Sequence, residues 1–140
     1  MTAQIILTRD IATCHALRRQ VFILEQGVSL AEEVDGRDAE ALHLLATMDG
    51  VAVGTARILL GSGYGKIGRV CVLSSVRGLG LGAGLIRAAM ARLRAEPGIT
   101  EARLGAQTHA LGFYEALGFR AYGPEYLDAG MPHRDMVCKL

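Results

Sequence analysis

The chain has 140 residues, the size of one ordinary domain, and we expect residues 1–140 to fold as a single domain. Hydrophobic residues make up 51% and charged residues 21%, which predicts a folded chain and excludes a disordered one. The net charge of +1 excludes the strong basic excess typical of nucleic-acid and membrane-surface proteins. The sequence shows neither a signal peptide nor an apolar run near the ~20 residues that span a bilayer, so we expect a cytoplasmic protein with no membrane partner.

The three cysteines, Cys14, Cys71 and Cys138, are odd in number and widely spaced. No Cys-x-x-Cys pair occurs, so the sequence predicts neither a disulfide framework nor a metal site. Reduced thiols agree with the cytoplasmic expectation.

Charge is unevenly distributed along the chain. Between residues 25 and 40 there are six acidic residues and one arginine, the acidic ones being Glu25, Glu32, Glu33, Asp35, Asp38 and Glu40. Between residues 66 and 95 there are six basic residues and no acidic one: Lys66, Arg69, Arg77, Arg87, Arg92 and Arg94. Two interpretations stay open: solvated faces of opposite sign, or one region for an anionic ligand and another that favours a cation.

The first predicted elements are a strand over residues 4–8 and a helix that begins after Asp10. Asp10 occupies an N-cap position, and apolar residues then recur at helical spacing. We expect this helix to fade near Gly27. The acidic stretch that follows, up to Glu40, has neither helical nor strand periodicity, which predicts a loop with at most a short helix.

A three-stranded meander is predicted next. Residues 41–48 and 51–60 have the composition of strands, and Asp49-Gly50 between them is a strong hairpin signal. Residues 61–63 form another turn, and residues 66–73 are predicted to be the third strand. Its interior, residues 67–72, is apolar on both faces, as expected of a central strand.

The second half of the chain alternates helices with strands. We predict, in order, a helix over 80–95, a strand over 101–107, a short helix over 110–117, and strands over 119–122 and 135–140. The resulting order, β-α-β-β-β-α-β-α-β-β, indicates an α/β protein with a mixed sheet.

The glycine-rich turn before the helix at residue 80 is the most informative segment. Glycines at 78, 80 and 82 let backbone amides approach a ligand, the helix directs its positive end there, and Arg77 adds a charge. This arrangement predicts a phosphate or pyrophosphate site, although the glycines alone can also serve packing. A dinucleotide-binding loop is disfavoured because the turn follows a meander and not the first strand of a βαβ unit. No Gly-Lys-Ser/Thr follows, which excludes a P-loop.

Two segments resemble the motifs of the GNAT acetyltransferases. Residues 77–82, RGLGLG, resemble the R/Q-x-x-G-x-G/A signature, and residues 110–119, ALGFYEALGF, resemble the A-x-x-F-Y-x-x-x-G-F segment. Further segments resemble the ElaA-like branch of the family: residues 19–26, 33–38, 68–70, 104–107 and 130–133, together with His43. The resemblance covers nearly the whole chain.

The resemblance implies an α+β fold, the GNAT acyl-CoA N-acyltransferase fold, with a largely antiparallel central sheet, flanking helices and one splayed strand pair. It implies an acyltransferase that moves an acetyl group from acetyl-CoA to a primary amine by direct attack in a ternary complex, without a metal. Main-chain groups of Val70, Cys71 and Val72 would pair with the pantetheine arm of the coenzyme. The remaining implied coenzyme contacts are Arg77, Gly78, Leu79, Gly80, Leu81 and Gly82 at the pyrophosphate and Phe113 beside the arm.

Tyr114 is the implied general acid, because the family's tyrosine at this place protonates the departing thiolate. A phenol with a pKa of ~10 keeps its proton at neutral pH. Packing in the core is the alternative role for this tyrosine. Cys71 is interpreted as a small buried residue and not as a nucleophile, since the reaction needs no acyl-enzyme.

The base that deprotonates the amine is open among Glu25, Glu33 and His43. For each of them a structural role, in an ion pair or a hydrogen bond, is an equal alternative. Many members of the family place an acidic base on the central strand, where this chain has Arg69 instead. His133 can line the acceptor pocket or can be a loop histidine without a role.

Two other functions compete with acetyl transfer. A non-catalytic acyl-CoA sensor or interaction module would bind the coenzyme without turnover, and a nucleotide-binding regulator would rest on the glycines alone. The acceptor itself is left open as a small-molecule or peptide amine, and dimerisation is left open as well.

Overall fold

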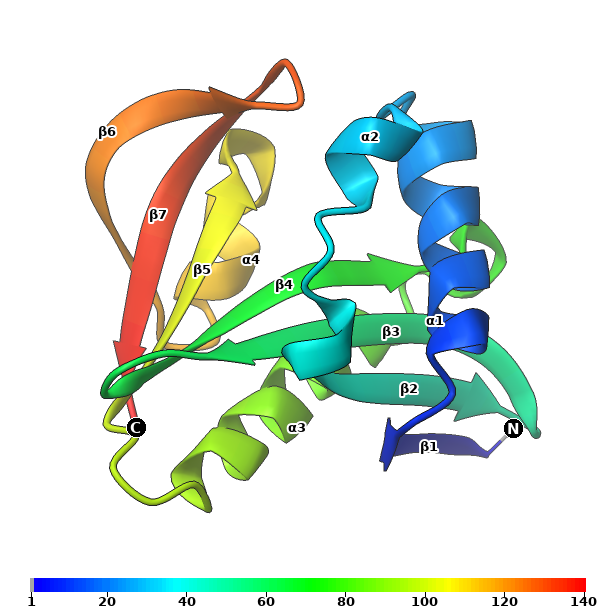
Figure 1. Ribbon diagram of the computed structural model, residues 1–140, viewed down its shortest axis with the longest axis horizontal. Helices are drawn as coiled ribbons and strands as arrows, with labels where there is room; N and C mark the ends of the chain where they lie inside the picture. The colour runs from blue at the N-terminus through cyan, green and yellow to red at the C-terminus, as the bar shows by residue number, and fades with distance from the viewer. Residues whose placement is uncertain (1) are drawn as a thin grey trace.

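A computed structural model describes residues 2–140 and shows one sheet with helices on both faces (Figure 1). The strands are β1 (Ala3–Thr8), β2 (Leu42–Met48), β3 (Val51–Leu60), β4 (Tyr64–Val72), β5 (Glu101–Gln107), β6 (Arg120–Asp128) and β7 (Met131–Lys139). The α-helices are α1 (Ile11–Arg18), α2 (Leu30–Glu33), α3 (Leu81–Arg94) and α4 (Leu111–Glu115). A π-helix, η1 (Arg19–Glu25), and three short 3-10 helices complete the chain: η2 (Asp38–Glu40), η3 (Ser74–Val76) and η4 (Thr108–Ala110).

The seven strands lie in the order β1-β2-β3-β4-β5-β7-β6. The β4–β5 pair is parallel, and the other neighbouring pairs are antiparallel. Pairing between β4 and β5 covers only residues 64–66 and 101–103, after which the two strands diverge (Figure 1). The predicted α/β fold with a largely antiparallel sheet and one splayed pair is therefore confirmed.

The predicted N-terminal helix is confirmed, but it changes type halfway. The Asp10 carboxylate accepts a hydrogen bond from the Thr13 amide at 3.1 Å and caps α1. From Arg19 the helix widens into the π-helix η1, and the chain leaves it at Gly27, whose φ is +74°. Two short helices, α2 and η2, lie in the acidic stretch that the sequence predicts to be mostly loop.

The predicted meander is also confirmed. Asp49 and Gly50 join β2 to β3 with φ angles of +51° and +82°, the left-handed pair that a two-residue hairpin turn requires. The third strand, β4, begins at Tyr64, two residues before the predicted start.

The last two strands are longer than predicted and form a hairpin whose tip is residues 128–131. The prediction of a loop around His133 is wrong, because His133 lies on β7 and pairs with Gln107 and Tyr126. Two prolines concealed these strands. Pro124 lies where the β6–β7 register shifts, and Pro132 lies beyond the last residue that β5 pairs, so neither interrupts a central ladder.

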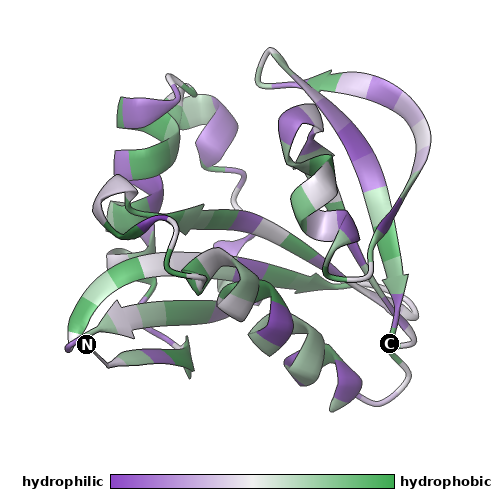
Figure 2. Ribbon diagram, turned by 180° about the vertical axis from the view of Figure 1, so that it is seen from behind, coloured by the Kyte–Doolittle hydropathy of each residue, from purple (hydrophilic) through white to green (hydrophobic). Residues whose placement is uncertain are grey.

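The main core lies between α3 and the sheet. Leu85, Ile86, Ala89 and Leu93 of α3 are fully buried against the central strands. A second cluster under α1, on the opposite face, joins Leu17 and Val21 to Leu45 and Cys71. Figure 2 shows hydrophobic residues along the central strands, whereas the first half of β7, toward the hairpin tip, is hydrophilic. Among residues 2–140 no helix has the length and apolarity needed to cross a membrane.

We expect Leu85→Ala to lower the free energy of unfolding by about 2 to 5 kcal/mol, because it leaves a cavity in the main core. Urea denaturation measures the change. Leu127→Ala is the matched control: this leucine is 73% exposed, and we expect a change within about 0.5 kcal/mol. Equal effects of the two substitutions would contradict the assignment of the core.

Candidate active site

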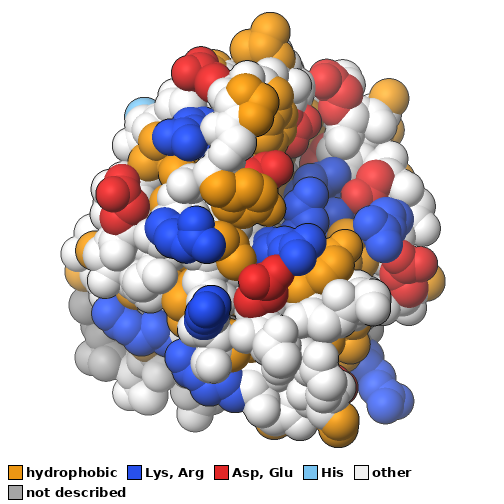
Figure 3. Space-filling model, turned by 90° about the vertical axis from the view of Figure 1, so that its left-hand side faces the viewer, with side chains coloured by type: hydrophobic (Ala, Val, Ile, Leu, Met, Phe, Trp, Pro, Cys, Tyr) orange, Lys and Arg blue, Asp and Glu red, His pale blue; other side chains and the backbone are white. Residues whose placement is uncertain are grey.

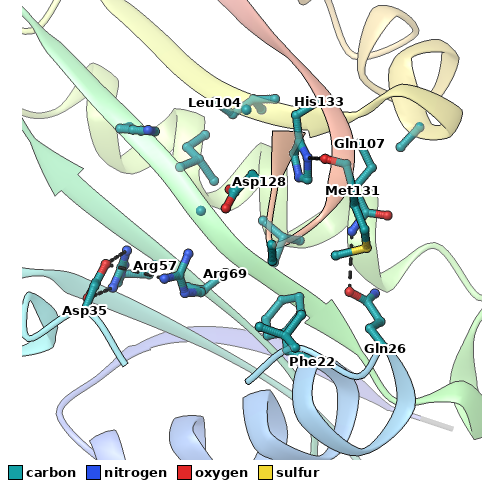
Figure 4. A pocket seen from close by; sticks show the side chains of 18 of the residues that line it. Phe22, Gln26, Asp35, Arg57, Arg69, Leu104, Gln107, Asp128, Met131 and His133 are labelled. Atoms are coloured by element: carbon teal, nitrogen blue, oxygen red, sulfur yellow. Dashed lines mark hydrogen bonds and ion pairs between the residues drawn. The ribbon is translucent and has the colours of Figure 1, made fainter. Parts of the chain in front are cut away.

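A cleft of about 400 Å³ opens where β4 and β5 diverge (Figure 4). It has walls from several parts of the chain: β4, the end of β5, helix α4, the β6–β7 hairpin and η1. The lining residues that matter below are Arg69, Val70, Tyr114, Tyr126, Asp128 and His133. Because β4 has no hydrogen-bonded partner on its β5 side here, main-chain groups border the cleft as well as side chains.

A β-bulge at Arg69 shapes the β4 wall. Two β4 residues, Arg69 and Val70, lie opposite the single β3 residue Ala56, and Arg69 has a φ of +51°. Such a left-handed conformation is strained for arginine and persists where surrounding contacts fix it. Here the guanidinium donates to the main-chain oxygen of Glu33 at 3.1 Å, so the bulge directs Arg69 toward α2.

The acidic stretch is matched by arginines inside the protein. Arg18, which is 1% exposed, forms ion pairs with Glu33 and with Asp38, the latter at 2.8 Å. Arg57 grips Asp35 with two hydrogen bonds of 2.8 Å. Three of the six acidic residues in this stretch, Glu33, Asp35 and Asp38, are therefore neutralised by buried arginines and are not displayed to a cationic ligand.

The pKa values of the two aspartates follow from these contacts. Hydrogen bonds from Arg57 lower the pKa of Asp35 to about 2, and a main-chain hydrogen bond from Arg37 adds to the effect. Burial acts to raise the pKa of Asp38, but hydrogen bonds from Arg18 and His15 outweigh it and hold that pKa well below its ordinary range. Both carboxyl groups are ionised at neutral pH.

None of the three candidate bases is among the described residues that line the cleft. Glu33 is buried in its ion pair with Arg18. Glu25 pairs with Arg77 at 2.6 Å on the surface. The buried His43 contacts the main-chain oxygen of Asp38 through Nε2 at 2.9 Å. Each of the three residues thus has the ion pair or hydrogen bond expected of the alternative, structural role. The base role stays a prediction.

Tyr114 lines the cleft from α4. Its ring packs edge-on against Phe113, with centroids 5.0 Å apart, and against Phe119 at 6.1 Å. Burial raises the pKa of the Tyr114 phenol above its ordinary value, so the hydroxyl keeps its proton at neutral pH. The side chain is fixed by packing while its surroundings favour the protonated form that an acid needs.

The glycine turn has the geometry of an anion site. Gly78 and Gly80 have φ angles of +85° and +82°, and Gly80 is the N-cap of the 14-residue helix α3. In the part of the chain that the structure describes, the amides of residues 78–83 have no main-chain acceptor. The helix dipole adds partial positive charge at the same place. Arg77 lies beside the turn, bonded to Glu25 and to the main-chain oxygen of Val72 at 3.0 Å.

The structure brings the two sequence motifs together. A Cβ built on Gly82 would lie 3.6 Å from the ring of Phe113, so α4 covers the first turn of α3. Val70 lines the cleft, whereas the Cys71 side chain faces the opposite side and packs under α1. Burial raises the pKa of the Cys71 thiol to about 12, which keeps it protonated and unreactive.

Tyr126 and Asp128 of the hairpin are cleft residues that the sequence did not indicate. Their strand was hidden by Gly123-Pro124, so no periodic signal placed them. The alternation of side chains along β6 could have identified them only if the strand itself had been predicted.

Around this hairpin, on the face shown in Figure 3, basic and acidic side chains are interspersed with apolar ones and form no large patch of one sign.

Comparison with known proteins agrees with the geometry. Residues 11–140 match the family model described as the acetyltransferase (GNAT) domain. An uncharacterized N-acetyltransferase of Bacillus subtilis, YjcF, is 39% identical over 122 residues, which are 86% of each chain. An acyl-CoA N-acyltransferase structure from Pseudomonas aeruginosa has a TM-score of 0.88 at 30% identity and covers 98% of this chain and 99% of its own. Escherichia coli ElaA has a TM-score of 0.84 at 27% identity and covers 98% of both chains.

The chain belongs to the GNAT acetyltransferase family and is an acyltransferase. The family uses acetyl-CoA as acyl donor. The resemblance found in the sequence, to the GNAT proteins and to ElaA in particular, is confirmed.

We expect Asp35→Asn to lower the free energy of unfolding at pH 7 by about 2 kcal/mol, because the pKa shift of Asp35 is lost. The lowered folded-state pKa stabilises the fold above the ordinary aspartate pKa of ~4. This contribution disappears as the pH falls from about 4 to about 2. The variant should therefore match the unmodified protein more closely at pH 2.5 than at pH 7 in urea denaturation.

Glu40→Gln is the control for this prediction. It removes the exposed Arg37–Glu40 pair, which we expect to contribute at most ~1 kcal/mol. A stability difference for Asp35→Asn that is the same at both pH values would contradict the ionic role of Asp35.

Proposed function

We propose that the protein transfers an acetyl group from acetyl-CoA to a primary amine by direct attack in a ternary complex. One observation carries the proposal: β4 and β5 separate beside a turn of unpaired amides, and Tyr114 lies in the gap. A thioester needs an extended channel for its arm, an anion site for its phosphates and a proton donor at sulfur. We propose that this region meets all three requirements.

The proposed coenzyme site follows β4. Main-chain groups of residues 70–72 pair with the pantetheine arm as an added strand would, because this edge has no β5 partner. Amides of residues 77–82 hold the pyrophosphate, and Phe113 covers the arm where α4 meets α3. Arg77 contributes a charge beside the same turn.

The proposed reaction has three demands. The neutral amine attacks the thioester carbonyl, and a main-chain amide near Val72 stabilises the oxyanion. The intermediate collapses with loss of the thiolate, which takes a proton from the Tyr114 hydroxyl. If Glu25, Glu33 or His43 removes the amine proton, it acts through water, because none of them borders the cleft.

The cytoplasm is the proposed location. The three cysteines are free thiols, as a reducing compartment maintains them.

The deciding experiment is calorimetric titration with acetyl-CoA, followed by a thiol-release assay over a panel of small amines, amino acids and lysine peptides. We expect binding and an amine-dependent release of thiol. Binding without release from any amine would favour a coenzyme sensor. Absence of binding would contradict the assignment of the glycine turn.

We expect Tyr114→Phe to lower kcat by about 100-fold or more while the Kd for acetyl-CoA changes little, because the substitution removes a proton donor and keeps the ring. Steady-state kinetics and calorimetry measure the two quantities. Tyr122→Phe, outside the cleft, is the control and should keep kcat within about twofold of the unmodified enzyme. Unchanged kcat in Tyr114→Phe would remove the acid role.

A further inference from the structure

The cleft contains a better-placed base than the three candidates outside it. Four described residues with a carboxylate or imidazole line the cleft. Asp35 is locked to Arg57 by two hydrogen bonds, and His109 is exposed and contacts Gln107 at 2.6 Å. Asp128 is an exposed carboxylate at the hairpin tip. The fourth, His133, is 8% exposed and held in a defined orientation.

One hydrogen bond determines which nitrogen of His133 is available. Nδ1 lies 2.8 Å from the main-chain oxygen of Met131. A carbonyl oxygen can only accept, so Nδ1 must carry the proton. In the neutral ring the lone pair is then on Nε2, which has no hydrogen-bond partner among the described residues. Figure 4 shows the ring reaching from β7 into the cleft.

The ring is held from a second side by Tyr126. The two rings stack with centroids 5.9 Å apart and planes 23° from parallel. The Tyr126 hydroxyl donates to Asp135 at 2.8 Å, which fixes the stacking partner in turn. A Cβ at position 105 would overlap that hydroxyl, so Gly105 makes room for it over β5. Packing of this kind holds the imidazole ring in one orientation, so that Nε2 keeps one position from which it can accept a proton.

His133 also lies at the end of the cleft where β5 ends and leads to α4. It pairs with Gln107, the last residue of β5, and Tyr114 follows a few residues later on α4. The charged and titratable groups that line the cleft with His133 come from several elements: Tyr126 and Asp128 from β6, His109 from η4, Tyr114 from α4, Lys66 and Arg69 from β4, Arg57 from β3, and Asp35 and Arg37 from the segment between α2 and η2. Asp135 of β7 accepts the hydrogen bond of the Tyr126 hydroxyl. Tyr114, the acid of the proposed reaction, and His133 thus line one cavity.

We propose that Nε2 of His133 accepts the proton of the acceptor amine as the amine nitrogen bonds to the thioester carbonyl carbon, an assignment that rests on the proposed acetyl transfer. The N–H bond breaks and its proton goes to Nε2. The C–S bond then breaks, and sulfur takes the Tyr114 proton. His133 releases its proton to solvent, and Tyr114 regains one, so the sum is an amide and a free thiol.

The test uses His133→Asn, whose amide nitrogen can replace the Nδ1 hydrogen bond but offers no base at the position of Nε2. We expect kcat/KM at pH 7 to fall by about 100-fold or more, with an unchanged Kd for acetyl-CoA. The plot of log kcat/KM against pH should lose one proton of slope in the variant, because the substitution removes the ionisable group that accepts the amine proton.

His15→Asn is the matched control, because His15 of α1 contacts Asp38 of η2 and does not line the cleft. It should keep both the rate and the slope of the unmodified enzyme. A His133→Asn variant with the unmodified slope would overturn the base role while leaving acetyl transfer intact. If the unmodified protein binds acetyl-CoA but no amine of the panel causes thiol release, the proposed function fails, and the base role fails with it.

A second measurement does not depend on turnover. The ¹⁵N chemical shifts of the His133 ring report which nitrogen bears the proton in the neutral form, with His133→Asn used to assign the signal. We expect the Nδ1–H tautomer. An Nε2–H tautomer would overturn the proposal, since the cleft-facing nitrogen would then have no lone pair.

Discussion

The site depends on the early end of the β4–β5 pairing. A sheet normally satisfies every main-chain donor and acceptor between its strands, and an unpaired edge inside it is unfavourable. Here pairing stops after Lys66 and Arg103, and the two strands separate instead of continuing the ladder. The resulting gap is bordered by main-chain groups that a substrate arm can satisfy. The cleft is thus formed by the geometry of the sheet first and by side chains second.

Buried ion pairs hold the segment that contains α2 and η2, which lines the cleft through Asp35 and Arg37. The large apolar side chains of the segment containing α2 and η2, Leu30 and Val34, are exposed. The segment is held in place by ion pairs and hydrogen bonds with Arg18 of α1, Arg57 of β3 and Arg69 of β4. Burying charges has a desolvation cost that counts against the attraction within the pairs, so we expect the network to contribute a defined position more than net stability. Removing one partner would leave an uncompensated charge, which explains why the three arginines and the three carboxylates form a single matched set.

Local signals in the sequence identified most of the fold and part of the site. The Asp49-Gly50 hairpin, the capped helix after Asp10 and the turn at Gly78 and Gly80 each depend on neighbouring residues and could be predicted. The partners of the acidic residues could not, because Arg57 lies 22 residues from Asp35 and meets it only through the fold. The role proposed for His133 was hidden for the same reason: Tyr126 and Met131 define its orientation only once β6 and β7 are paired.

One side of the cleft, the β6–β7 hairpin, is less tied to the main core than the other side. β6 is the edge strand of the sheet, joined to it only through β7, and its tip residues 128–131 are distant in sequence from the glycine turn. The proposed coenzyme side, by contrast, is built from β4 and the start of α3, which contribute to the main core. Exchange of the hairpin between relatives can therefore change which amine is accepted while the donor site is inherited unchanged. A single scaffold can in this way diversify its acceptors one loop at a time.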